Sequence, residues 1–262
     1  MSDALRFEWV RLRTIRSTWW LIASGLLLNL AAAAVLAGAT RHAGADPRIV
    51  ADVVTAGGAS FPVPLLAVFL AAIGIFATGH EYRYNTIQPT LTAIPQRARL
   101  LTAKVIVVGI TAVIVTLVSM VLNTAAGMIW WDGLPGLTTG PLGQVLAGYV
   151  LLGLLWSVVG TALGQLFRSV PAPLVTILAV PLIVEQLVLR LSFAPSLHWL
   201  TPAVKFLPFT AGQQLVSWAG EASGGSETEM HMLARWPSAA IFVIFTAAVL
   251  SAALTLFRRR DA

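Results

Sequence analysis

The sequence predicts an all-α membrane protein with six transmembrane helices, and two observations lead to this fold class. First, 57% of the 262 residues are hydrophobic and only 11% are charged, whereas soluble domains carry about 25% charged residues. Second, the charges are clustered and leave six long apolar runs between them. Because a helix needs about 20 apolar residues to cross a bilayer core of roughly 30 Å, each run is long enough to span a membrane. A soluble globular fold is therefore excluded.

The six spans are predicted to form a single transmembrane domain that covers residues 1–262. The fifth apolar run contains Glu185 but continues as apolar sequence to Leu191. The spans are placed near residues 17–38, 59–79, 101–123, 142–165, 170–191 and 236–257.

Lysine and arginine are distributed unevenly between the two sides of this topology. Twelve of the 17 fall on the side that holds both chain ends, and five fall on the opposite side. The positive-inside rule assigns the richer side to the cytoplasm. We therefore expect both termini to be cytoplasmic. We interpret the net charge of +6 as an orientation signal and expect no nucleic-acid partner.

Two segments outside the spans have recognisable character. Residues 3–16 place Leu5, Trp9 and Leu12 at helical spacing among arginines, which predicts an amphipathic helix lying in the cytoplasmic interface of the bilayer. The outer segment 192–235 is apolar in its first half but interrupted by prolines. We expect short outer helices there, supported by protein, because lipid cannot satisfy a broken backbone.

Several polar residues lie within the predicted spans. Thr116, Ser119 and Asn123 share one face of the third span, Asn29 lies in the first, and Glu185 is the one carboxylate inside a span. Such groups either hydrogen-bond between helices or line a substrate path. Both interpretations are open from the sequence, and all five residues are candidates for the path.

The fourth span carries a stripe of small residues on one face: Gly153, Ser157, Gly160 and Gly164. Small residues let another helix approach closely. The partner helix could belong to the same chain or to a second copy.

Catalytic and cofactor motifs are absent from the sequence. There is no cysteine, the four histidines are dispersed, and no phosphate-binding Gly-x-x-x-x-Gly-Lys-Ser/Thr loop occurs. We expect no catalytic residue, no metal site and no cofactor bound by this chain. The string from Glu185 to Arg190 is similar to the Glu-Glu-x-x-x-Arg of intramembrane CAAX-type proteases, but Gln186 replaces the second glutamate.

The cytoplasmic segment between the second and third spans is richer than a simple connection requires. From His80 to Arg97 it alternates charged, aromatic and apolar residues, with Ile87, Leu91 and Ile94 at helical spacing. This pattern predicts a short amphipathic helix suited to a groove on a partner.

This segment resembles the permease subunit of bacterial ABC-2-type transporters. That family has an acidic-aromatic-arginine start, Thr-Ile and Thr-Leu pairs, and a Pro-x-Arg close after the second span. Asn85 stands where a small residue such as glycine often precedes the first threonine. The residues that carry the resemblance, and that it implies couple to an ATPase, are Glu81, Tyr82, Arg83, Thr86, Ile87, Thr90, Leu91, Pro95 and Arg97.

The resemblance implies an exporter in the bacterial plasma membrane. Two permease copies, identical or related, would form the membrane part, and two copies of a separate ATP-binding subunit would bind ATP and Mg. The segment after the second span would be the coupling helix, with Glu81 and Arg83 supplying charged contacts and Ile87 and Leu91 apolar ones. The alternative is a six-helix membrane scaffold or signalling protein that transports nothing.

Overall fold

The computed structural model describes residues 2–43, 46–94, 96–131, 140–218 and 232–259, and over these ranges the secondary structure is helical. Six helical segments of the described chain are long and apolar enough to cross a bilayer, which confirms the predicted fold class. They are α2 (Arg16–Ala39), α4 (Leu65–Arg83), α6 (Arg97–Gly127), α7 (Gly140–Phe167), the continuous segment Pro171–Leu191 and α12 (Arg235–Arg259).

The fifth span is built from three pieces because its hydrogen-bond pattern changes midway. They are α8 (Pro171–Ala179), the π-helical segment η2 (Val180–Glu185) and α9 (Gln186–Leu191). Pro181, the second residue of η2, has no backbone N–H to donate, and such a residue interrupts the regular α-helical ladder.

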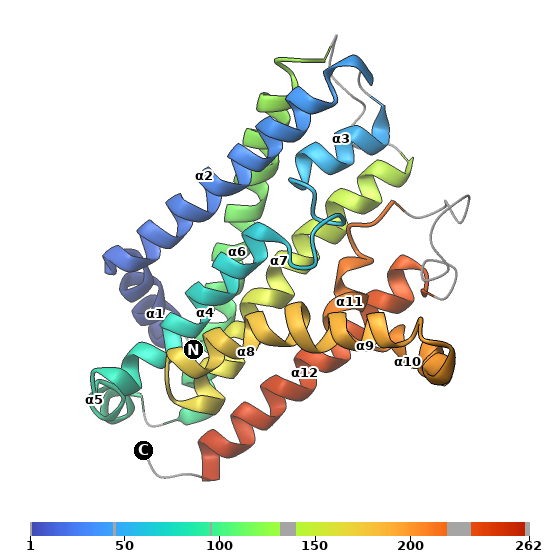
Figure 1. The fold of residues 1–262 in the computed structure, drawn as a ribbon. Helices are drawn as coiled ribbons and strands as arrows, with labels where there is room; N and C mark the ends of the chain where they lie inside the picture. Colours follow the sequence, from blue (N-terminus) through green and yellow to red (C-terminus); the bar gives the residue numbers. More distant parts are fainter. Residues whose placement is uncertain (1, 44–45, 95, 132–139, 219–231, 260–262) are drawn as a thin grey trace.

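Shorter helices lie between the spans. They are α1 (Ser2–Thr14), η1 (Arg41–Ala43), α3 (Pro47–Val54), α5 (Ile87–Ala93), η3 (Pro195–Leu200), α10 (Thr201–Val204) and α11 (Pro208–Gln213). Helix α5 lies at the same end of the bundle as α1 and the end of α12, while α3 lies at the opposite end (Figure 1).

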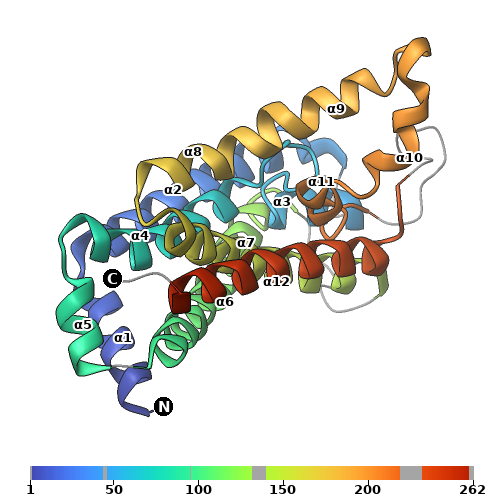
Figure 2. The ribbon, with the colours of Figure 1, turned by 90° about the horizontal axis from the view of Figure 1, so that it is seen from below.

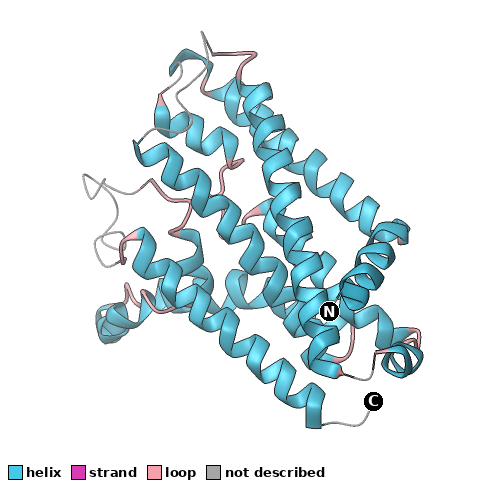
Figure 3. Ribbon diagram, turned by 180° about the vertical axis from the view of Figure 1, so that it is seen from behind, coloured by secondary structure: helices cyan, strands magenta, loops and turns pink. Residues whose placement is uncertain are grey.

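Helix α7 forms the centre of the bundle, with α4 packed along it (Figures 1 and 2). In both α4 and α7, 67% of the most apolar 18-residue stretch is buried within the bundle. In α2, the fifth span and α12 the buried share of that stretch is only 22%. The latter three are thus the least buried spans, and α6, at 44%, is intermediate. Figure 3 shows the same helical bundle from behind.

The close packing of α4 and α7 depends on glycines. A Cβ atom added at Gly160 would lie 2.1 Å from the carbonyl oxygen of Ala71, and one added at Gly74 would lie 2.4 Å from that of Ser157. The small-residue stripe of α7 therefore faces α4 of the same chain. Gly153 and Gly164, at its two ends, also meet side chains of this chain.

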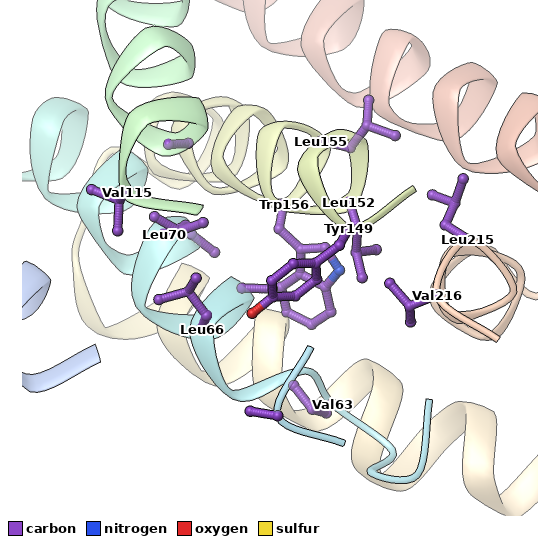
Figure 4. Packing of buried hydrophobic residues seen from close by; sticks show 14 of the residues in the cluster. Val63, Leu66, Leu70, Val115, Tyr149, Leu152, Leu155, Trp156, Leu215 and Val216 are labelled. Carbon is purple, nitrogen blue, oxygen red and sulfur yellow. The ribbon is translucent and has the colours of Figure 1, made fainter. Parts of the chain in front are cut away.

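The hydrophobic core surrounds α7 in the half of the bundle that holds α3. Tyr149, Leu152 and Trp156 of α7 lie between Leu66 on α4 and the Leu215–Val216 turn that follows α11 (Figure 4). The outer segment therefore contributes to the core.

The second span begins later than expected. Its helix starts at Leu65 instead of residue 59, because Pro62 and Pro64 lack backbone donors and hold the preceding residues extended. The sequence interpretation also missed α3. Asp46 caps this helix by accepting from the backbone N–H of Arg48 (2.8 Å), and Pro47 occupies its first turn.

Candidate functional site

The candidate site is the connection between α4 and α6, which carries α5 beyond the ends of the spans (Figure 1). The chain leaves α4 through a turn in which the backbone N–H of Thr86 donates to the carbonyl of Glu81 (2.9 Å). Asn85 has a positive φ of 53°. Asparagine tolerates this left-handed conformation better than most residues, which gives a conformational reason for a glycine or asparagine at this position.

The apolar side of α5 faces its own chain. Ile87 is 5% exposed and forms a cluster with Leu100 and Leu101 of α6 and Phe257 of α12. Leu91 packs against the same cluster. The sequence interpretation directed Ile87 and Leu91 toward a partner. The structure corrects this direction, because α5 uses its apolar side to dock on the spans.

The outward side of α5 and its preceding turn is mostly polar. Its exposed members are Arg83, Tyr84, Asn85, Thr86, Gln88, Pro89 and Thr92. Thr90 points inward and is buried. A partner that docks on this connection therefore meets amides, hydroxyls, an arginine and the Tyr84 ring in place of the expected aliphatic side chains.

The far end of the connection is tied to α12. The Arg97 guanidinium donates to the carbonyl oxygen of Phe257 (2.9 Å) and lies 5.8 Å from the centroid of its ring. Pro95 falls outside the described residues. Together with the cluster around Ile87, this contact fixes α5 to the last span.

Tyr82 links the start of the connection to the turn between α7 and α8. Its hydroxyl accepts a hydrogen bond from the Gln165 side chain. The guanidinium of Arg168 lies 5.4 Å from the centroid of the Tyr82 ring, within the range of a cation–π contact. The structure thus brings the two turns at this end of the bundle together through Tyr82.

Behind α5, four charged side chains form an ionic cluster: Glu8 and Arg11 of α1, Glu81 of α4 and Lys104 of α6. The Lys104 ammonium lies 2.8 Å from a Glu8 carboxylate oxygen and 2.6 Å from one of Glu81. Arg11 pairs with Glu8 at 3.3 Å and also contacts Glu81 and the carbonyl oxygen of Ala77.

The ionic cluster is buried, so its charges depend on one another. Lys104 is 1% exposed, Glu81 2% and Glu8 3%. The negative charges of the two carboxylates are balanced by the two cations. This balance is needed because a buried charge without a partner is strongly destabilising. The cluster therefore holds α1 against α4 and α6. Glu81, expected to contact a partner, instead turns into the protein.

The cluster also sets which side of α1 faces the bundle, while the position of α1 in the bilayer interface stays a prediction. Its inner side carries Ala4 and Glu8, whereas Phe7, Trp9 and Val10 are exposed. Sequence reasoning counted Lys104 only as a charge of the cytoplasmic side. Lys104 lies within the apolar sequence of the third span, and this position could have indicated a buried ion pair.

Three of the polar residues predicted for the spans meet in one hydrogen-bonded network. Asn29 accepts from Ser119 (2.7 Å) and from Asn123 (2.8 Å) through the same amide oxygen. Asn123 also donates to the carbonyl oxygen of Val54 at the end of α3 (2.9 Å). Tyr149, which sequence reasoning missed, accepts from the Asn29 amide at 3.4 Å. The network joins α2, α3, α6 and α7.

The other two candidates lie apart from this network. The Thr116 hydroxyl donates to the carbonyl oxygen of Ala112, one turn earlier in α6 (2.9 Å). The Glu185 carboxylate accepts from the backbone N–H groups of Phe209 (2.9 Å) and Thr210 (2.6 Å) and from the Thr210 hydroxyl (2.7 Å). It satisfies the free donors at the start of α11, so it serves the hydrogen-bonding role that the sequence left open.

Comparison with known families matches residues 4–186 to the ABC-2 family transporter proteins. The chain belongs to this family. The matched region of the ABC-2 chain extends from α1 to the first residue of α9, and it contains the ionic cluster, α5 and the Asn29 network. No curated protein sequence matches the chain.

Membership in the ABC-2 family identifies the chain as the membrane component of a transporter. With the six apolar helices, it defines a multi-pass membrane protein. The CAAX-protease resemblance carries no further weight, since Glu185 is engaged by α11.

Proposed function

We propose that this ABC-2 chain is the transmembrane subunit of an ATP-driven exporter in the bacterial plasma membrane, with both termini cytoplasmic. A second permease copy completes the membrane part, and two copies of an ATP-binding subunit carry ATP and Mg. The observation that supports this proposal is α5: a short helix, standing beyond the spans, whose exposed side is polar and whose apolar side is fastened to its own bundle.

The contacts of α5 suit it to transmit movement. Ile87 connects it to α6 and α12, Tyr82 connects its entry to the α7–α8 turn, and Glu81 connects that entry to α1. A displacement of α5 by a partner would reach most of the bundle through these contacts. ATP-driven transport needs such a link, because the ATPase can shift the membrane part only by interacting differently with its two states.

The test is ATP hydrolysis by the assembled transporter. The chain is co-expressed with the ATP-binding subunit encoded beside it, purified and reconstituted in liposomes. Thr92→Trp adds bulk on the exposed side of α5, and Thr102→Trp adds the same bulk at an exposed position of α6. We expect the first variant to lose the ATP-binding subunit or its stimulated ATPase activity, while the second retains both.

Two results would overturn the proposal. If no ATP-binding subunit is retained by the unaltered chain under gentle conditions, the non-transporting scaffold becomes the better account. If Thr92→Trp binds and hydrolyses as the unaltered chain does, α5 is not the docking element.

A further inference from the structure

The fifth span packs against the bundle along only half of its length. Pro173 and Ile177 of α8 are buried, and α8 packs on α4 and α7. None of the described residues of α9 is buried, and α9 chiefly contacts its chain neighbours η2, η3 and α10. From α8 to α9 the span runs away from α5 (Figures 1 and 2). Its far half therefore lacks the apolar packing that holds the near half.

The loss of packing coincides with a change in the backbone. The π-helical segment η2 starts at Val180, just after Ile177, the last buried residue of α8. Pro181 and Glu185 are the buried residues of η2. Proline removes a backbone donor, and π-helical turns are places where a helix bends. Segment η2 therefore has the position and the backbone of a hinge between α8 and α9.

One side chain fastens this hinge to the rest of the protein. The Glu185 carboxylate accepts the backbone N–H groups of Phe209 (2.9 Å) and Thr210 (2.6 Å) and the Thr210 hydroxyl (2.7 Å). We call these three hydrogen bonds the Glu185 clasp. Hydrogen bonds are lost once donor and acceptor are more than about 3.5 Å apart. A small displacement of the fifth span is therefore enough to open the clasp.

The other side of the clasp belongs to the core around α7. The Phe209 ring lies 5.0 Å from that of Trp156 on α7 and 5.7 Å from that of Phe242 on α12, measured between centroids. Leu215 and Val216, which follow α11, are also part of this core. Helix α11 is thus held by apolar packing as well as by the clasp. When the clasp opens, α11 stays with α7 and α12, and α9 is the part that moves.

We propose that the Glu185 clasp is a gate of the transporter. Its release lets α9 swing about η2 and opens the bundle, at the end away from α5, between the fifth span and the ring of Phe209. The inference rests on the proposed function, in which an opening at this end releases cargo on the side opposite the ATP-binding subunit. Glu185 then acts through the position of α9 and not by binding cargo.

The first experiment measures the mobility of a spin label on the full-length chain in nanodiscs, without an ATP-binding subunit. Because the chain contains no cysteine, Leu187→Cys places a single label on α9 and Val175→Cys a matched one on α8. Both side chains are exposed, at 54% and 64%. Glu185→Gln and Thr210→Val weaken the clasp from its two sides. On α9 we expect the mobile fraction to rise about tenfold with Glu185→Gln and about threefold with Thr210→Val, and on α8 to stay unchanged.

The second experiment closes the clasp covalently in the complex with the ATP-binding subunit. The Glu185 carboxylate and the Thr210 hydroxyl are in contact, so a short bifunctional thiosulfonate can join the thiols of Glu185→Cys and Thr210→Cys. We expect the cross-linked complex to keep the ATP-binding subunit but to hydrolyse ATP about tenfold more slowly, because the membrane part is held in one state. Reduction should restore the rate, and the reagent should leave the single Glu185→Cys variant unaffected.

Three results would overturn the gate. They are an unchanged label on α9 when the clasp is weakened, an equal rise in mobility on α8, and a cross-linked complex that hydrolyses ATP as fast as the reduced one. In each case the proposed function would stand. If the unaltered chain binds no ATP-binding subunit, the proposed function fails, and the label on α9 still decides whether the clasp opens.

Discussion

Removing the positive charge of Lys104 is expected to destabilise the end of the bundle that holds α1 and α5. Lys104→Met keeps the length and apolar stem of the side chain but deletes the ammonium that lies within 2.8 Å of both Glu8 and Glu81. Only Arg11 then opposes two buried carboxylates. Breaking a buried ion pair by removing one partner costs about 3–5 kcal/mol, which is a large part of the roughly 5–15 kcal/mol that stabilises a typical domain.

The assay is unfolding of the purified protein in mixed micelles with increasing sodium dodecyl sulfate, followed by helical circular dichroism. Hydrogen exchange of residues 2–14 reports separately on the release of α1. Arg99→Met is the control, because Arg99 is exposed at the same end of the molecule. We expect it to change the free energy of unfolding by less than about 0.5 kcal/mol.

A second variant tests the electrostatic origin of the loss. Glu8→Gln in the Lys104→Met background restores neutrality, because Arg11 and Glu81 then remain as a pair. We expect it to recover at least about 1 kcal/mol, within the coupling range of contacting residues. The reasoning is refuted if Lys104→Met costs no more than Arg99→Met, or if Glu8→Gln makes the double variant less stable still.

Three other predictions concern the bundle and its outer end. Gly160→Ala should lower the free energy of unfolding by about 1–3 kcal/mol, since the new Cβ would lie 2.1 Å from the carbonyl oxygen of Ala71. The control Gly38→Ala, whose new Cβ would lie 4.0 Å from its nearest neighbour, should be neutral in the same assay. Equal effects of the two variants would disprove the tight α4–α7 contact. Glu185→Gln should cost about 1–3 kcal/mol and speed hydrogen exchange in residues 208–213, because one amide oxygen cannot replace a carboxylate that accepts three hydrogen bonds. Lost transport with unchanged exchange would assign this residue to the substrate path instead. Asn123→Leu should lower the free energy of unfolding by about 0.6–2 kcal/mol and make α3 more susceptible to protease, since it removes the donor to the Val54 carbonyl. A variant as stable as the unaltered chain, with α3 equally protected from protease, would contradict a structural role for the network.

Much of the fold is visible in the sequence because the bilayer imposes simple demands on it. Five of the six predicted spans begin and end within four residues of the helices, since a spanning helix must be apolar over a fixed length. The exception is the start of α4, where Pro62 and Pro64 delay the helix inside an otherwise apolar run. Helix α5 was also predictable, because its apolar residues recur at helical spacing.

The surface that the apolar side of α5 contacts was not predictable from the same pattern. Helical spacing identifies an apolar face but not the surface that covers it. Ile87 was assigned to a partner, yet it contacts Phe257, 170 residues further along the chain. That contact determines which residues of this connection are left exposed.

By itself, the sequence determined the fold class, the six spans, the short helix after the second span and the family resemblance that the comparison confirmed. Only the tertiary structure decided which helices are central and which residues meet, such as Lys104 with Glu8 or Glu185 with Thr210. The physical reason is that lipid and a neighbouring helix are both apolar. The hydrophobic pattern of a spanning helix therefore cannot distinguish the face that packs from the face that touches lipid, and each buried charge finds its partner only when the helices assemble.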